Sequence, residues 1–284
     1  MIYFEISGTT WMQELVWLVN NDLDFQAAKD KPLYKRFPML EITTQIPEIA
    51  FELIKVNFLN LGSFQGLKEA VKIPSWKSIE KAPSPRFIKT HLPISMLPPN
   101  LLNTAKVVYV ARDPRDVVVS YYYLHKMIGK RLIRATLNHF WEAFRRDLSF
   151  PKRPTTAINS HEGTLHYHYN YPFQLIKSLL SSLFQDLPNE INSICKFLNR
   201  DYSDAQIKLL AEHLSFDSLR KNKNVNNTTR GDDCNQFVRK GVAGGWQSHF
   251  DEKMQLQAEE FLISRLQGLD LAYPSFPIHE ITRL

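Results

Sequence analysis

The sequence predicts an α/β domain built around a buried parallel sheet, and three observations support this fold class. The chain has 284 residues, of which 44% are hydrophobic, so it can form a sizeable core. The stretch 105–114, AKVVYVARDP, is a nearly continuous apolar run, as expected of a strand covered on both faces of a parallel sheet. Apolar runs also lead twice through a polar turn into a segment with helical spacing. These polar turns follow the carboxyl ends of the strands, which is the edge where open α/β sheets bind their ligands.

The first of these crossings lies at the N-terminus, where the strand-like MIYF (1–4) is followed by the helical pattern WMQELVWLVNN (11–21). The turn between them is Ser-Gly-Thr-Thr. Gly8 lets the backbone approach an anion closely, N–H groups at the helix start point toward it, and Thr9 and Thr10 add hydroxyl donors. This turn is typical of phosphate binding, with a plain Ser/Thr helix cap as the alternative. It lacks the GxxxxGK[ST] pattern of nucleoside-triphosphate loops.

The second crossing follows the apolar run 105–114 and continues into a helix, RDVVVSYYYLHKM. Arg112 stands at the end of the buried strand, and Ser120 lies in the helix that follows. We expect these two side chains to clamp one phosphate group. The alternative is a surface salt bridge from Arg112 to Asp113 or Asp116.

The stretch KTHLP carries the candidate catalytic base, His91. It lies where a short strand (Phe87, Ile88) runs into a loop, and a neutral imidazole there can take a proton from a hydroxyl. Lys89, two residues earlier, is expected on the same side and could hold an anion. The alternative is a structural histidine.

The stretch 222–250 is rich in Gly and Asn, and its length predicts a functional loop. Arg239, Lys240 and Gly241 place two cations beside a flexible backbone, an anion nest that a loop can close over a ligand. A solvated charged loop is the alternative. Amphipathic helices are expected on either side, over 187–198, 203–214 and 251–266.

The net charge of +6 favours anionic ligands, although a generally basic surface would have the same charge. No dense Lys/Arg run with interleaved aromatic residues indicates nucleic-acid binding. The two cysteines, Cys195 and Cys234, form no disulfide framework. No signal peptide is recognised. No apolar run approaches the roughly 20 residues that a membrane span needs. These features predict a cytoplasmic protein.

The segment 151–183 has no clear secondary-structure pattern. It contains His161, His166 and His168, which could suggest a metal site. We expect an irregular exposed segment instead, because no Cys or acidic ligands accompany them at fixed spacing.

Taken in order, these motifs resemble the cytosolic sulfotransferase family, which uses 3′-phosphoadenosine 5′-phosphosulfate (PAPS) as sulfonate donor. The similarity runs through nearly the whole chain. It is carried by the blocks RFPMLE (36–41), APSPRFIKTHLP (82–93), LPPNLLNTAKVVYVARDPRDVVVSYYYLHKM (97–127), ICKFL (194–198), AEHLSFDSLRKN (211–222) and FVRKGVAGGW (237–246). The resemblance implies one sulfotransferase domain over 1–284, with a central parallel five-stranded sheet, helices on both faces and a P-loop-like turn.

The resemblance also implies a role for each candidate residue. The 5′-phosphosulfate would be held by Ser7, Gly8, Thr9 and Thr10. The adenine would be contacted by Trp11 and Phe216. The 3′-phosphate would be held by Arg112, Ser120, Arg239, Lys240 and Gly241. His91 would take the proton of a small, apolar hydroxyl acceptor of phenol, alcohol or steroid type during in-line transfer, with Lys89 in support and no metal.

The chain departs from the family pattern YPKSGTTW, because Phe4, Glu5 and Ile6 precede the Ser-Gly-Thr-Thr turn and Ile6 replaces the lysine. Losing one such donor typically costs roughly 10²–10³ in rate. A first alternative is therefore an impaired protein that binds PAPS or its desulfonated product, 3′-phosphoadenosine 5′-phosphate (PAP). A small-molecule kinase is a second, although GK[ST] and a Mg²⁺-binding carboxylate are missing.

Further departures concern the ends and the middle of the chain. Relative to the family we expect an incomplete N-terminus and a diverged segment at 151–183. Gly244-Gly245-Trp246 stands where the family has Gly-Asp-Trp. The dimerisation pattern KxxxTVxxxE is not recognised, so the oligomeric state stays open.

Overall fold

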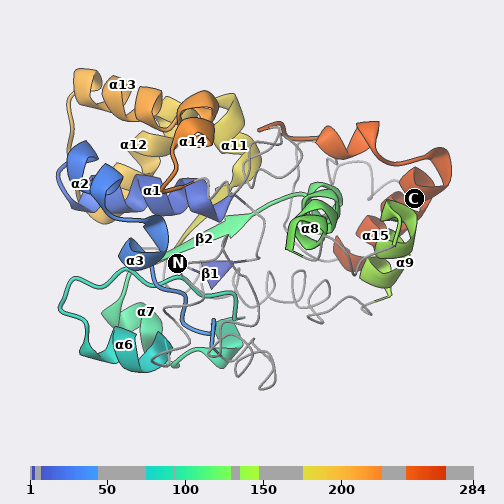
Figure 1. Ribbon diagram of the computed structural model, residues 1–284, viewed down its shortest axis with the longest axis horizontal. Helices are drawn as coiled ribbons and strands as arrows, with labels where there is room; N and C mark the ends of the chain where they lie inside the picture. The colour runs from blue at the N-terminus through green and yellow to red at the C-terminus, as the bar shows by residue number, and fades with distance from the viewer. Residues whose placement is uncertain are drawn as a thin grey trace. The chain divides into compact units, whose positions relative to one another are not determined.

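The computed structural model describes residues 2–3, 8–43, 75–92, 94–128, 135–146, 175–225 and 241–266. The chain divides into two compact units. The first comprises Met1–Tyr3, Thr9–Leu92 and Pro188–Arg239, and the second comprises Phe4–Gly8, Pro93–Leu187 and Lys240–Leu284. Figure 1 labels most of the helices and strands of both units. Each unit is described by itself.

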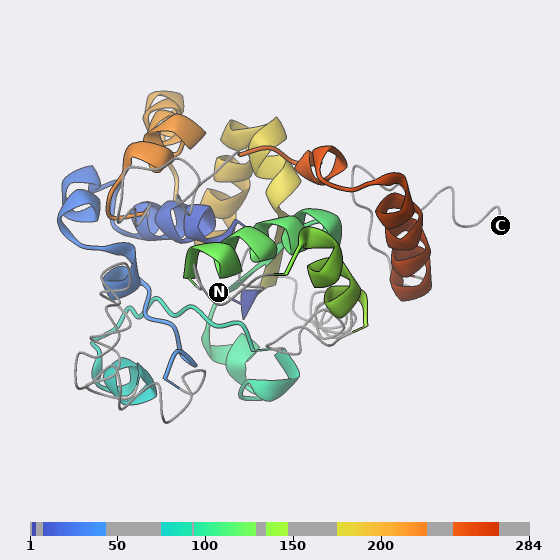
Figure 2. The ribbon, with the colours of Figure 1, turned by 45° about the vertical axis from the view of Figure 1, so that its right-hand side comes forward.

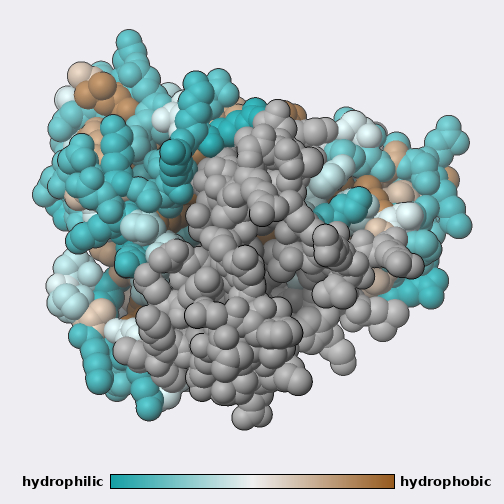
Figure 3. Space-filling model, viewed as in Figure 1, coloured by the Kyte–Doolittle hydropathy of each residue, from teal (hydrophilic) through white to brown (hydrophobic). Residues whose placement is uncertain are grey.

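The described elements of the first unit are mainly helical. They are β1 (Ile2–Tyr3), α1 (Thr9–Asn20), α2 (Phe25–Asp30), α3 (Leu33–Arg36), α6 (Ser75–Lys81), α12 (Leu187–Leu198), α13 (Asp204–His213) and α14 (Phe216–Lys221). The sequence predicted the strand and helix on either side of the first turn, and both are present. It also predicted α12 and α13, and α13 begins with a capping box between Ser203 and Gln206. Figure 3 shows hydrophilic residues over most of the visible surface of α2 and α13.

The second unit contains a parallel pair of strands and several helices. Its elements are η1 (Ile94–Met96), α7 (Leu101–Thr104), β2 (Val107–Ala111), α8 (Pro114–Ile128), α9 (Leu137–Arg145), β3 (Leu175–Leu179), α11 (Leu180–Gln185), η3 (Gly245–Ser248) and α15 (Glu252–Leu266). All five residues of β2 are buried, which confirms the predicted strand. The two strands pair from Val107 with Leu175 to Ala111 with Leu179. Strand β3 lies within 151–183, where the sequence indicated no element.

The strand expected at Phe87 and Ile88 was wrong. The backbone there forms an isolated parallel bridge one residue later, between Met39 and Lys89. The N–H of Leu40 donates to the carbonyl oxygen of Lys89 at 2.8 Å, and the N–H of Lys89 donates to that of Pro38 at 3.0 Å. This short pairing joins two blocks that are far apart in the sequence.

A buried ionic network joins α1, α3 and α13 in the first unit. Glu14 accepts a hydrogen bond from Arg36 Nη2 at 2.7 Å, and its other oxygen lies 3.0 Å from His213 Nε2. The Arg36 guanidinium also lies over the ring of Trp17, 4.8 Å from its centroid. Buried charges are tolerated when they are paired in this way.

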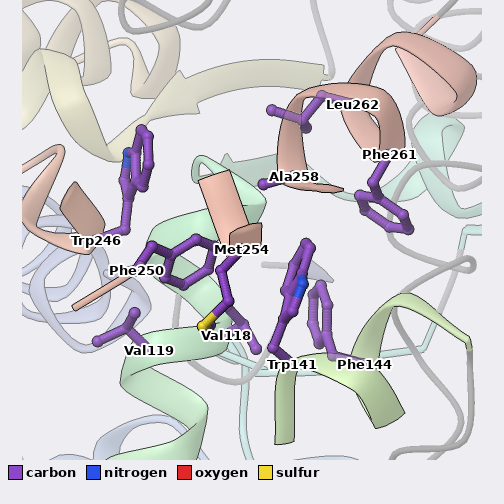
Figure 4. Packing of buried hydrophobic residues seen from close by; sticks show 10 residues of the cluster. All are labelled: Val118, Val119, Trp141, Phe144, Trp246, Phe250, Met254, Ala258, Phe261 and Leu262. Atoms are coloured by element: carbon purple, nitrogen blue, oxygen red, sulfur yellow. The ribbon is translucent and has the colours of Figure 1, made fainter. Parts of the chain in front are cut away.

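Aromatic side chains form the core of the second unit, where α8, α9 and α15 meet. Figures 1 and 2 both show α9 beside α8. Figure 4 shows the rings of the core pointing toward one another, with Trp141 5.2 Å from Phe250 and 5.9 Å from Phe261 between ring centroids. Trp141 Nε1 donates to Gln257 at 3.0 Å, so its one polar group is satisfied. Trp246 belongs to the same cluster.

No helix among the described residues is both long enough and apolar enough to cross a membrane.

Candidate active site

Gly8 directly precedes helix α1. Gly8 has a φ of +86°, in the left-handed region that glycine adopts without steric cost. Helix α1 begins at the next residue, Thr9, which is buried, whereas Thr10 is half-buried and Trp11 is buried. The backbone N–H groups of the first turn of α1 therefore follow directly after this glycine. Ser7, with the three residues before it, lies outside the described part of the chain.

His91 is held by a buried glutamate, Glu41. The backbone N–H of His91 donates to Glu41 Oε1 at 2.6 Å, and His91 Nδ1 lies 2.8 Å from the same oxygen. Thr90 Oγ1 donates to Glu41 Oε2 at 2.8 Å. Both His91 and Glu41 are buried. The sequence predicted His91 as a site residue but missed Glu41, which closes the block RFPMLE.

Backbone pairing explains why these two residues meet. The bridge between Met39 and Lys89 sets the register, and Glu41 and His91 each follow it by two residues. Ser75 adds a hydrogen bond from its hydroxyl to the carbonyl oxygen of Leu40 at 2.6 Å. Lys89, the proposed support of the base, is half-buried and takes part in the bridge through its backbone.

The Glu41 carboxyl is acidic despite its burial. Burial raises the pKa of Glu41, but the hydrogen bonds from His91 and Thr90 and the charge of His91 together lower that pKa below its ordinary value. The charged form is therefore the stable one near neutral pH. The stability that this pairing adds is present above the ordinary carboxyl range and is lost as the pH falls through the lowered pKa.

Arg112 and Ser120, the two residues expected to clamp one phosphate group, contact each other directly. Arg112 Nη1 donates to Ser120 Oγ at 2.8 Å, from the residue after β2 to a residue in α8. Of the two alternative salt bridges, Asp113 pairs instead with Arg115, at 2.7 Å. Asp116 does form a salt bridge with Arg112, with its Oδ2 3.9 Å from Arg112 Nε, so this part of the alternative is present beside the contact with Ser120.

Asp116 connects this pair to the end of the Gly-rich loop. Its two carboxylate oxygens accept hydrogen bonds from the N–H of Gly244 at 2.8 Å and of Trp246 at 3.0 Å. Burial raises the pKa of Asp116, partly offset by the charge of Arg112 and by these two N–H groups. Arg115 lies over the ring of Trp246, 4.1 Å from its centroid. The sequence analysis named Asp116 only as a possible partner of Arg112 and missed its contact with the Gly-rich loop.

The remaining predicted residues are placed as follows. Gly241 has a φ of +60°, three residues before the segment held by Asp116, whereas Arg239 and Lys240 lie outside the described residues. Phe216 is half-buried and is the first residue of α14. The histidines at 161, 166 and 168 are also outside the described part. Within that part, no group of three or more His, Cys, Asp or Glu side chains is arranged to hold a metal ion.

Comparison with known proteins identifies the class to which this chain belongs. Residues 4–270 match the model of the sulfotransferase domain, so the chain belongs to the sulfotransferase domain family. It is therefore an α/β protein of a family whose members transfer sulfonate groups.

Individual relatives agree with this class. The chain is 31% identical to luciferin sulfotransferase of Photinus pyralis over 275 residues, covering 92% of this chain and 70% of that protein. It is 29% identical to sulfotransferase 1 family member D1 of Mus musculus, covering 95% and 83% of the two chains. Among solved structures, it is similar to retinol dehydratase in complex with androsterone and inactive cofactor PAP, with a TM-score of 0.84 and 34% identity, covering 96% and 82%.

Proposed function

We propose that this protein transfers a sulfonate group from PAPS to the hydroxyl of a small, apolar acceptor of phenol, alcohol or steroid type. The contact between Arg112 and Ser120 carries the proposal, because it places two donors together directly beyond a buried strand. Such a pair suits a phosphate group. The similarity to a protein solved with androsterone or retinol and PAP supports an apolar acceptor.

The proposed fold is a single domain over 1–284 with a five-stranded parallel sheet. The proposed location is the cytoplasm. Both proposals follow from the family resemblance. The proposed ligands of the nucleotide are Ser7, Gly8, Thr9, Thr10, Trp11, Arg112, Ser120, Phe216, Arg239, Lys240 and Gly241. The left-handed backbone at Gly8 and the start of α1 support the phosphosulfate turn.

The proposed mechanism is an in-line displacement. His91 accepts the hydroxyl proton while the acceptor oxygen forms a bond to sulfur, and the bond from sulfur to the phosphate oxygen breaks. The products are a sulfate ester and PAP, and the negative charge gained by the phosphate is stabilised by N–H groups at the start of α1 and by Lys89. The buried position of His91 supports this role, since a dry site strengthens such interactions.

The first experiment is a transfer assay with purified protein, PAPS and a panel of phenols, sterols and apolar alcohols. We expect formation of a sulfate ester together with an equal amount of PAP. Binding of PAP without any turnover would support the impaired binding protein that Ile6 suggests. Phosphate transfer from ATP would support the kinase alternative and overturn the proposal.

Arg112→Ala should weaken PAP binding. A hydrogen bond to a charged group contributes about 1.5–3 kcal/mol, so the dissociation constant should rise by about 10- to 100-fold. Calorimetric titration with PAP measures it. Arg145→Ala is the control, because Arg145 forms its salt bridge with Glu142 within α9 and not with Arg112 or Ser120. Equal affinities for PAP in the wild type and in Arg112→Ala would remove Arg112 from the site.

A further inference from the structure

We propose that Glu41 is the positioning residue of the active site, selecting the tautomer of His91 and stabilising the imidazolium that forms during transfer. The inference deepens the proposed function and rests on it, since His91 acts as base only in that reaction. Glu41 contacts His91, and in this proposal it acts on the reaction through His91 and not by binding PAPS or the acceptor.

The geometry shows a carboxylate built to hold one histidine. Its Oε1 receives both the backbone N–H and the ring of His91, and its Oε2 receives the hydroxyl of Thr90. The side chains of Glu41 and His91 are 4% and 2% exposed. Two contacts from the same residue fix both the position of its backbone and the orientation of its ring. A ring held in this way loses little entropy when the acceptor binds.

The ionisation state of Glu41 decides which ring nitrogen carries the proton. Because its hydrogen bonds lower the pKa of Glu41, the group is a carboxylate near neutral pH and can only accept hydrogen bonds. Nδ1 of His91, 2.8 Å away, must therefore be the donor. In the neutral ring, Nε2 then has the lone pair and is the atom that can accept a proton.

The same contact becomes stronger as the reaction proceeds. When Nε2 takes the hydroxyl proton, His91 becomes a cation 2.8 Å from a buried carboxylate. An opposite charge at this distance favours the protonated ring, and the effect is larger in a dry interior than in water. Thr90 also donates its hydroxyl to the carboxylate of this pair, and the half-buried Lys89 precedes Thr90 in the chain. Interactions that strengthen in the transition state raise kcat.

Glu41→Gln tests the charge while keeping the size of the side chain. We expect kcat to fall by about 10- to 100-fold, a part of the 10²–10⁴ that a general base contributes. The KM for PAPS and the thermal shift caused by PAP should stay close to wild type. The acid limb of the profile of kcat/KM against pH should move to lower pH, because protonated His91 loses its counter-charge. A purely structural role for Glu41 would leave that limb in place.

Thr90→Val is the matched control, because it removes a hydrogen bond from the same carboxylate without changing the charge. It should leave the acid limb where it is. An unchanged kcat and pH profile in a folded Glu41→Gln variant would overturn the proposal.

The tautomer can also be read in the unmodified protein. The ¹⁵N chemical shifts of the His91 ring, assigned by comparison with His91→Gln, should show Nδ1 protonated and Nε2 unprotonated in the neutral state. A ring protonated at Nε2 would overturn the proposal even if Glu41→Gln failed to fold. This measurement needs no turnover, so it separates a failure of the Glu41 proposal from a failure of the proposed function.

Discussion

Replacing His91 by glutamine is expected to lower the rate of sulfonate transfer by roughly 10²–10⁴-fold. Glutamine can still occupy the space beside Glu41, but it cannot take a proton from the acceptor. Its amide can donate to the Glu41 carboxylate, so the buried charge keeps a partner. The substitution should therefore lower kcat and leave the stability of the folded protein close to that of the wild type.

Two measurements separate chemistry from binding in this variant. Transfer is followed with PAPS and the best acceptor, and nucleotide binding is followed by thermal unfolding with PAP. A ligand at 100 times its dissociation constant adds about 2.7 kcal/mol of stability, and we expect that increment in both proteins.

His213→Gln is the matched control, because His213 also pairs with a buried glutamate, Glu14. It should keep a turnover close to wild type. Comparable losses of turnover in the two variants would argue that His91 is a structural residue, the alternative considered from the sequence.

Ile6→Lys is expected to raise the turnover number by roughly 10²–10³, the effect typical of one preorganised donor in the transition state. The sequence places Ile6 where the family pattern YPKSGTTW has lysine, two residues before Gly8. An ammonium group there would stabilise the charge that develops on the leaving phosphate. The residue lies outside the described part of the chain, so this prediction rests on the sequence alone.

Steady-state kinetics with PAPS test the gain, and Ile6→Met is the control because it changes the shape of the side chain without adding charge. We expect Met to behave like the wild type. A gain with both substitutions would point to packing in place of charge. If the wild type already has a high turnover number and Ile6→Lys does not raise it, another group supplies the missing positive charge. Lys89 is the first candidate for that group.

Much of the fold could be predicted because it depends on local patterns. The apolar run of β2 and the periodic spacing in α1, α8 and α15 are each contained in one segment. Strand β3 could not be recognised, since its sequence LIKSL includes Lys177 and Ser178 and its assignment comes from pairing with β2. The short strand at 87–88 was wrong for a similar reason, because the partner segment decides where pairing occurs.

The difference between local patterns and contacts from distant segments also explains which contacts of the candidate site could be predicted. Arg112 and Ser120 could be paired from the sequence because only eight residues and one turn separate them. Glu41 and the loop contact of Asp116 were missed because the partners are distant in the chain, with a sequence separation of 50 from Glu41 to His91 and of 128 from Asp116 to Gly244. No local pattern marks a carboxylate whose partners come from another part of the chain. Such contacts require the folded arrangement.

The buried network of Glu14, Arg36 and His213 has a consequence for the evolution of this chain. Removing Glu14 or Arg36 alone leaves its buried partner without its counter-charge, whereas replacing both by well-packed apolar residues can be neutral or stabilising. We therefore expect selection against substitution of one partner alone, and weaker selection against simultaneous replacement of both. Across related genes, the codons of Glu14 and Arg36 should change together or remain together.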